Sequence, residues 1–323
     1  MRGRKVLITG GFGFIGSNLA HRLIAGGADV SVLDNLDPRS GCNRANLEGI
    51  DDRLRHINAD LCDIEVCRSA VTDQSLIIHC AALTSHSGSQ ETPIDYARTN
   101  CIGTLVLLEA LRRNNPEARL IVLGTSTQVG EMVGPLIDEN HCEFPTDVYS
   151  ATKTAAEKYV LTMMRSRPLR ATVVRLGNVY GPRAHIKTPY LGFVNFFIGR
   201  ALQGKDITVF GRGNQKRNLS YVDDVVDHIL RVAASDATVG QIYFATADRH
   251  MTVHEIAKAI AAHVGGQVRC VPWPQDRVAL EAGDAVISNA KLKSLIGALA
   301  STDLGDGLRA TAAYYRDRLP GYL

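Results

Sequence analysis

Short apolar runs alternate with longer amphipathic stretches along the first half of the chain. The apolar runs occupy residues 6–9, 30–33, 76–80, 120–123 and 171–176, and the amphipathic stretches occupy residues 15–25, 96–113 and 149–165. Continuous apolar runs of this length are typical of strands that helices cover on both faces. The repetition of strand and helix predicts an α/β fold built on a doubly wound parallel sheet.

This alternation stops after Gly181. The later pattern predicts a helix at residues 193–202, a strand at 207–210, a helix beginning at Asp223 and a strand at 241–244. We expect residues 1–177 to form one domain, which residues from about 218 to 248 rejoin. Residues 178–323 are expected to form mainly a smaller, interleaved C-terminal domain.

The composition argues against several kinds of partner. The 323 residues carry a formal net charge of +3, which is too small to indicate binding to nucleic acid or to a membrane surface. The seven cysteines form no CxxC pair and no zinc-type spacing, so we expect reduced thiols and no metal. No apolar run approaches the roughly 20 residues that cross a bilayer, and we expect a cytoplasmic protein.

A glycine-rich turn follows the first predicted strand and opens the first predicted helix. Gly10, Gly13 and Gly16 are spaced G-x-x-G-x-x-G, with Phe14 and Ile15 at the start of the helix. Such glycines let the backbone turn tightly and approach a pyrophosphate at the positive N-terminus of the helix. Glycines are common in loops, but their place between strand and helix predicts a dinucleotide-binding Rossmann domain.

The second predicted strand ends in a carboxylate. Asp34 lies 18 residues after Gly16, where it can accept hydrogen bonds from the adenosine ribose and would repel a 2′-phosphate. It therefore favours NAD, although the nearby cations Arg39 and Arg44 leave NADP open. A solvated aspartate at a strand end is the alternative interpretation.

Three further residues are candidates for the cofactor pocket. Asp60, with Leu61 beside it, is predicted to close the third strand and meet the adenine edge; a turn aspartate is the alternative. Asn100 is an unfavourable residue inside a helix, which indicates a specific hydrogen-bonding role.

A tyrosine and a lysine begin the helix predicted at residues 149–165. Tyr149 and Lys153 are spaced i, i+4 and share one helix face, although this spacing is also common on structural helices. A free tyrosine has a pKa of about 10, and an adjacent ammonium together with a positive nicotinamide ring would lower it. Tyr149 could then remove a hydroxyl proton while the neighbouring carbon passes hydride to NAD. Thr125, at the end of the fifth predicted strand, is a candidate proton relay at the same sheet edge.

Six stretches spread over nearly the whole chain share the pattern of one family, at residues 9–16, 79–82, 100–104, 149–153, 175–183 and 211–217. In them the chain resembles the extended short-chain dehydrogenases/reductases of the NAD-dependent sugar-nucleotide epimerase and dehydratase family, close to UDP-glucose 4-epimerases. The resemblance implies an NAD-binding first domain, a second domain that binds a nucleotide sugar, and a homodimer.

The resemblance also assigns residues to the two ligands. The further NAD contacts that it implies are Asn35, Ala81 and Ala82. The implied substrate contacts are Ser85, Gly88 and Thr127 around the sugar, and Asn178 and Arg217 at the pyrophosphate. A guanidinium forks onto phosphate oxygens, although a plain surface cation is the alternative for the arginine.

The residues that follow Thr125 separate the reactions of this family. Related 4,6-dehydratases carry an Asp and a Glu there, and related decarboxylases keep a Glu, because eliminating water needs an extra acid and base. Ser126 and Thr127 stand here instead, which favours epimerisation at C4 through a 4-keto intermediate. The alternatives are a dehydratase or decarboxylase, a dehydrogenase or reductase that releases its cofactor, and a non-catalytic NAD-binding protein.

Two positions depart from the family pattern. Val129 replaces a tyrosine, and Glu281 stands where the family has an arginine that grips the nucleotide. A negative charge near phosphates is unfavourable. Either Arg277, one turn away, replaces that arginine, or the nucleotide is held differently.

Overall fold

A seven-stranded parallel sheet forms the centre of the protein in the computed structural model, which describes residues 1–166, 169–278, 281, 283–299 and 301–323 but not the side chains of Asp276 and Arg277. Its strand order is β10-β6-β5-β4-β1-β2-β3. The strands are β1 (Lys5–Thr9), β2 (Asp29–Asp34), β3 (Leu54–Asn58), β4 (Leu76–His79), β5 (Arg119–Thr125), β6 (Arg170–Leu176) and β10 (Ile242–Ala245). Because β1 lies between β2 and β4, the strand order reverses there, as in a doubly wound fold.

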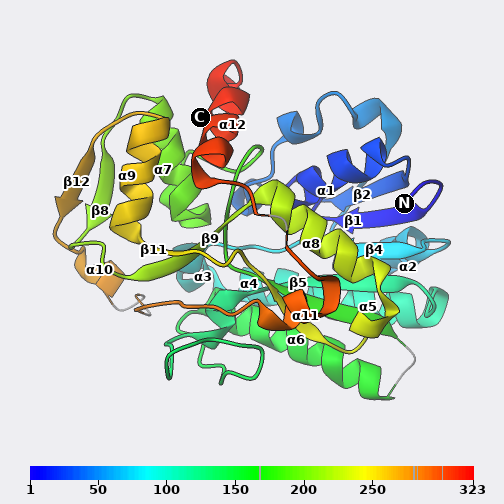
Figure 1. Ribbon diagram of the computed structural model, residues 1–323. Coiled ribbons are helices and arrows are strands. Elements are labelled where there is room, and N and C mark those ends of the chain that lie inside the picture. Colours follow the sequence, from blue (N-terminus) through cyan, green and yellow to red (C-terminus); the bar gives the residue numbers. More distant parts are fainter. Residues whose placement is uncertain (167–168, 279–280, 282, 300) are drawn as a thin grey trace.

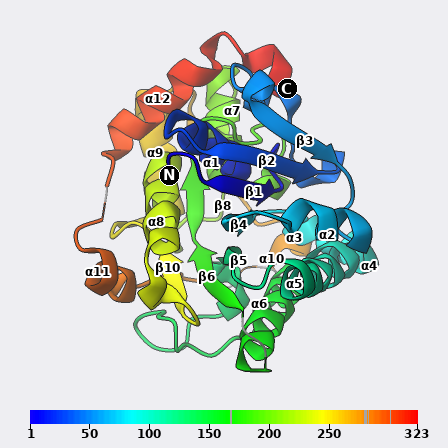
Figure 2. The same cartoon turned by 90° about the vertical axis from the view of Figure 1, so that its right-hand side faces the viewer.

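Helices cover both faces of this sheet, as Figures 1 and 2 show. On one face lie α1 (Phe14–Ala25) and α8 (Val222–Ala234); on the other lie α2 (Ile64–Val71), α5 (Gly103–Asn114) and α6 (Val148–Ser166). The side chains of β1 alternate between the two cores: Val6 and Ile8 pack with the first helix pair, and Leu7 packs with the second group. The predicted doubly wound α/β fold is therefore confirmed.

The second half of the chain adds two small sheets beside the main one. One holds β7 (Asn178–Tyr180), β9 (Lys216–Tyr221) and β11 (His250–Thr252); the other pairs β8 (Ile207–Phe210) with β12 (Val268–Val271). Their helices are α7 (Phe193–Leu202), α9 (Val253–His263) and α12 (Leu304–Arg316), and the shorter α10 (Gln275–Val278) and α11 (Ala290–Ile296). In Figure 1, β8, β12, α7 and α9 lie together to the left of the main sheet. Along the described stretches, no helix is both long enough and apolar enough to span a bilayer.

The helix predicted over residues 96–113 is interrupted. The structure has α4 (Pro93–Tyr96), a π-helical segment over Ala97–Ile102, and then α5. Asn100 lies in the π-helical segment, where its buried side chain bonds the backbone of Leu83 in both directions, at 2.9 and 3.0 Å. Its amide also donates to Thr152 Oγ1 at 2.9 Å. The wider π-helical turn thus brings the Asn100 amide to the loop after β4. The sequence predicted an uninterrupted helix here.

A buried ion pair ties the sheet to α6. Arg175 on β6 has no exposed surface, and its Nε and Nη2 donate to the Glu157 carboxylate of α6 at 2.8 and 2.6 Å. Gln128, which follows β5, donates to the same carboxylate at 3.0 Å. Two charges removed from water are tolerated only when they satisfy each other. The pair therefore fixes the position of α6, the helix that carries Tyr149.

Arg175→Met is expected to lower the free energy of unfolding by about 3–5 kcal/mol, because the buried Glu157 carboxylate loses its buried cationic partner and keeps only Gln128 and the half-exposed Lys158. Urea unfolding measures this loss. Arg170→Met is the matched control on the same strand, because its pair with Asp236 is exposed and contributes at most about 1 kcal/mol. The double variant Arg175→Met/Glu157→Met should recover part of the loss. Equal losses for Arg175→Met and Arg170→Met would contradict the anchoring role.

Candidate active site

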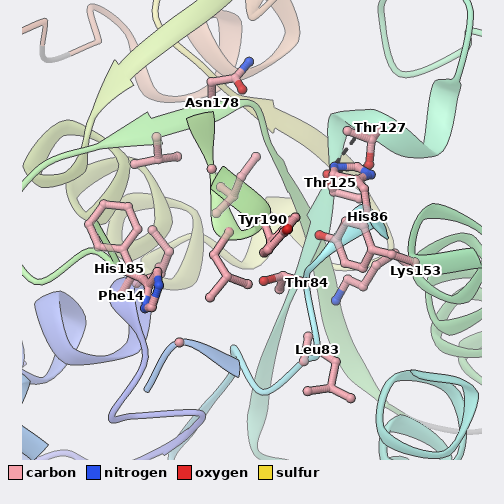
Figure 3. A pocket seen from close by; sticks show the side chains of 18 of the residues that line it. Phe14, Leu83, Thr84, His86, Thr125, Thr127, Lys153, Asn178, His185 and Tyr190 are labelled. Carbon is pink, nitrogen blue, oxygen red and sulfur yellow. Dashed lines mark hydrogen bonds between the residues drawn. The ribbon is translucent and has the colours of Figure 1, made fainter. Parts of the chain in front are cut away.

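A cavity of about 820 Å³ lies along the carboxyl edge of the main sheet. The loops after β1, β2, β4 and β5 line one side, and segments between residues 177 and 285 line the other. Figure 3 shows Thr125, Thr127 and Lys153 together at one side of the cavity, with Phe14 and His185 at the opposite side. This is the edge where parallel sheets with a reversal of strand order bind their ligands.

The glycine turn forms a tight cradle at the start of α1. Gly10 has φ +71°, and a Cβ there would lie 2.7 Å from the Ala81 backbone. A Cβ on Gly16 would lie 2.2 Å from the Gly10 carbonyl oxygen. Gly13 is the N-cap of α1 with no side-chain cap, and the first turn carries no acidic residue. Gly10, Gly13 and Gly16, with Phe14 and Ile15, line the cavity and leave room for a phosphate at the positive helix end.

Asp34 ends β2 and faces the same cavity. Its two carboxylate oxygens accept hydrogen bonds from the backbone amides of Phe12, at 3.0 Å, and Leu36, at 2.8 Å. Burial raises the pKa of this carboxyl, and the two amides partly oppose that shift. Each oxygen has a further lone pair, so the geometry suits a carboxylate that is held in place to accept ribose hydroxyls.

Asn35, Asp60 and Leu61 line the cavity beside Asp34. Asp60 does not close β3 as predicted, because the strand ends at Asn58. Asp60 Oδ1 accepts the Cys62 amide at 2.8 Å, so this residue stabilises a turn and also faces the cavity. The structure therefore shows the turn aspartate, and contact of Asp60 with adenine stays a prediction.

The residues after β4 divide into two groups. Ala81 and Ala82 line the cavity, whereas Asn100 is not among its lining residues. The Asn100 amide instead holds the Leu83 backbone and Thr152 on α6. Asn100 therefore joins the loop after β4 to the helix of Tyr149, and its contact with the cofactor stays a prediction. Its place inside a predicted helix indicated a hydrogen-bonding role but not the partners.

Tyr149 and Lys153 lie at one side of the cavity on α6, and both are buried. Burial raises the pKa of Tyr149 to about 12, although a hydrogen bond with Thr125 opposes that shift. Burial also lowers the pKa of Lys153 to about 8. In the chain by itself, desolvation outweighs the hydrogen bond from Thr125, so the predicted lowering of the tyrosine pKa would have to come with the bound nicotinamide ring.

Thr127 joins this side of the cavity, but two other predicted sugar contacts do not. Thr127 Oγ1 lies 3.1 Å from Thr125 Oγ1. Ser85 is instead the N-cap of α3 (His86–Glu91), and its Oγ accepts the Gly88 amide at 2.9 Å. A Cβ on Gly88 would lie 2.8 Å from the Tyr96 hydroxyl, so this glycine serves close packing. Neither Ser85 nor Gly88 is among the lining residues.

Sequence reasoning missed His86 and Asp147, which both line the cavity. His86 Nδ1 lies 2.6 Å from Asp147 Oδ2. Their positions in the sequence could have indicated a role in the site, because His86 follows Ser85 and Asp147 lies two residues before Tyr149. The pairing itself joins residues 61 positions apart, which no local pattern indicates.

Asn178 and Arg217, the residues predicted to contact the pyrophosphate, both line the cavity. Arg217 Nη2 pairs with Glu281 Oε1 at 2.6 Å, and Nη1 donates to the Gly283 carbonyl oxygen at 2.5 Å. Glu281, which departs from the family pattern, therefore neutralises the charge of Arg217. The side chain of Arg277 lies outside the described part of the structure. The described residues contain no cluster of three or more His, Cys, Asp or Glu side chains suited to a metal.

Residues 6–244 match the profile of the NAD dependent epimerase/dehydratase family. The chain belongs to this family. It is 28% identical to dTDP-glucose 4,6-dehydratase from Mycobacterium tuberculosis, over 97% of this chain and 93% of the relative. It is 31% identical to UDP-glucuronic acid decarboxylase 1 from Xenopus tropicalis, over 98% of this chain and 73% of the relative.

A solved relative extends this similarity to a third reaction. UDP-glucose 4-epimerase from Thermus thermophilus, in complex with NAD, superposes with a TM-score of 0.84 at 29% identity, covering 97% of this chain and 99% of the relative. The cofactor of this chain is accordingly NAD. The glycine cradle and the carboxylate of Asp34 suit its pyrophosphate and adenosine ribose.

Lys153→Met is expected to stabilise the NAD-free protein at pH 7. The folded chain buries an ammonium with a pKa of about 8, against 10.5 when it is exposed to water. This cost, about 3 kcal/mol, is fully present below pH 8 and disappears as the pH rises to about 10.5, because the unfolded chain then also loses the proton. Thermal unfolding from pH 7 to pH 10.5 should show a stability difference that shrinks with pH.

Lys258→Met, which removes an exposed lysine of α9, is the matched control and should show no such trend. A Lys153→Met protein no more stable than the parent at pH 7 would contradict the burial argument.

Proposed function

We propose that this protein epimerises a nucleotide-linked hexose at C4 through a 4-keto intermediate. The observation that carries the proposal is the convergence of Tyr149, Thr125 and Lys153 on the cavity that also contains the glycine cradle. The side of the cavity after Thr125 carries Ser126 and Thr127, and neither can serve as the carboxylic acid that dehydration would use there. Epimerisation needs only removal and return of one proton and one hydride.

Each of the three residues has a separate task in this reaction. Tyr149 accepts the proton of the C4 hydroxyl and later returns it, and Thr125, hydrogen-bonded to the phenol, holds the substrate oxygen or relays the proton. Bound NAD supplies the hydride acceptor and a positive charge that favours the phenolate. Lys153 anchors the nicotinamide ribose and adds its charge when protonated. Rotation of the keto sugar would present its other face to the cofactor, which would supply the hydride to that face.

Dehydration and decarboxylation are the second candidate, because relatives with those activities are as similar to the chain as the epimerase is. Both use the same oxidised intermediate and differ in what leaves the sugar. The products separate the candidates: a C4 epimer of equal mass supports our proposal, whereas loss of water or carbon dioxide would refute it.

The purified protein should convert UDP-glucose or another UDP-hexose to its C4 epimer without added cofactor and without net formation of NADH. Tyr149→Phe should lower the rate by about 10²–10⁴-fold, because it removes the group that moves the proton. Proton NMR of the sugar and absorbance of the nicotinamide measure both quantities. Tyr159→Phe, on the same helix and outside the cavity, is the control and should keep its activity. Full activity of Tyr149→Phe would refute the mechanism.

Glu281→Gln is expected to bind UDP more tightly, by roughly 2- to 5-fold, since it releases Arg217 from an ion pair and removes a negative charge near the diphosphate. Isothermal titration calorimetry with UDP measures the change. Glu131→Gln is the control, because Glu131 is exposed and does not line the cavity. Weaker binding by Glu281→Gln would show that the carboxylate itself holds the nucleotide.

A further inference from the structure

The cavity contains a second group suited to moving protons. His86 is the first residue of α3, lines the cavity and keeps 43% of its side chain exposed. Its Nδ1 lies 2.6 Å from Oδ2 of Asp147, whose side chain is only 4% exposed. The ring is therefore held by one nitrogen, and the residue lines the cavity with part of its side chain exposed.

Asp147 determines which nitrogen carries the proton. Burial alone would raise the pKa of Asp147, but hydrogen bonds from His86 and Ser150 bring it below its ordinary value. The Ser150 amide donates to Oδ1 at 2.8 Å, and Ser150 Oγ lies 3.2 Å from Oδ2. Since Asp147 is a carboxylate, Nδ1 of His86 donates to it. The neutral ring then has its lone pair on Nε2.

His86 also belongs to the same side of the cavity as the tyrosine. The rings of His86 and Tyr149 are perpendicular, with centroids 5.2 Å apart. Ser150 Oγ donates to Thr127 Oγ1 at 2.8 Å, and Thr127 is hydrogen-bonded to Thr125. In Figure 3, His86 lies beside Thr125 and Thr127. A sugar whose C4 hydroxyl meets the tyrosine therefore presents its neighbouring carbons near the imidazole.

We propose that His86 is a second general base of this site and exchanges the hydrogen on a carbon next to the oxidised C4. The inference rests on the proposed function, because that reaction generates the ketone. A carbonyl makes the hydrogens on its two neighbouring carbons acidic, and a positioned imidazole is a suitable base for them.

The step balances with the groups already present. Nε2 takes the proton from C3 or C5, and the C–H electron pair becomes the double bond of an enolate. The C4 oxygen takes the negative charge and accepts a hydrogen bond from the Tyr149 phenol, which carries the proton taken from the C4 hydroxyl. The exposed imidazolium exchanges its proton with water and then returns one to carbon, which restores the ketone. No electron leaves the sugar in this step.

The pair of His86 and Asp147 also has a simpler explanation, since it joins α3 to the start of α6. An anchoring role predicts a loss of stability when the pair is broken, with no specific effect on proton exchange at carbon. Exchange at carbon therefore separates the two explanations.

The first experiment runs the NAD-containing enzyme in D₂O with a UDP-hexose and locates deuterium in the sugar by NMR and mass spectrometry. A 4-epimerase without a second base returns only the original hydride and puts no solvent deuterium on carbon. We expect deuterium at C3 or C5 in the product and in recovered substrate. Epimerisation without deuterium on carbon would overturn the role of His86 while leaving the proposed function intact.

The second experiment supplies the ketone directly, as UDP-4-keto-6-deoxyglucose in D₂O, to the enzyme loaded with NADH, so that it does not depend on the epimerase reaction. Enzyme-dependent exchange above the spontaneous rate supports the second base even if no UDP-hexose is epimerised. In that case the function proposed above fails and this inference stands. Absence of such exchange overturns the inference.

Variants assign the exchange to the residue. His86→Gln should slow exchange by about 100-fold, within the range of lost general-base catalysis, and should change the rate of hydride transfer far less. Asp147→Asn should slow exchange less, because the imidazole loses only its orienting carboxylate. His263→Gln, outside the cavity, is the control. If His86→Gln is folded by thermal unfolding and exchanges as fast as the parent, the base is another group and the proposal is wrong.

Discussion

The parallel pairing of the central strands brings the whole site together. Because β1, β2, β4, β5 and β6 run in the same direction and in register, their last residues end at one edge. The last residues of four strands therefore lie at one edge of the sheet, although they span more than a hundred positions in sequence. They are Thr9, Asp34, His79 and Thr125. The loops that follow them have only to turn away from the sheet, and the space between them becomes the cavity. Glycine at the first turn keeps that space open, since any side chain at Gly16 would meet the backbone of Gly10.

Burial controls the chemistry of this edge. The phenol of Tyr149 and the ammonium of Lys153 both lie out of water, and burial shifts the pKa of each away from its charged form. The chain alone therefore keeps the tyrosine protonated. A cationic ligand beside the phenol reverses that balance, because an opposite charge acts strongly where water is excluded. In the proposed mechanism, Tyr149 would therefore act as a base only when its cofactor is bound.

The sequence was sufficient for the features that depend on local pattern. Apolar runs located the strands, and the spacing of Gly10, Gly13 and Gly16 located the cradle, because both follow from neighbouring residues. Asn100 was identified as unusual, but its partners within the chain were not predicted, since its amide bonds Leu83 and Thr152 across the fold. These contacts depend on how the π-helical segment is oriented toward the loop after β4. The spacing of residues along the chain does not indicate that orientation.

The same limit explains the residues that were missed. Ser85 has the local signature of a helix cap and serves as one, and its contact with the sugar stays a prediction. His86, one residue later, turns toward Asp147 from another element. Ser126 and Thr127 have hydroxyl groups at the positions where related dehydratases have carboxylates. The three-dimensional site nevertheless contains a carboxylate and an imidazole, supplied from α3 and the start of α6. The reaction of such a chain is therefore determined by the complete set of groups around the sugar, not by one segment of sequence.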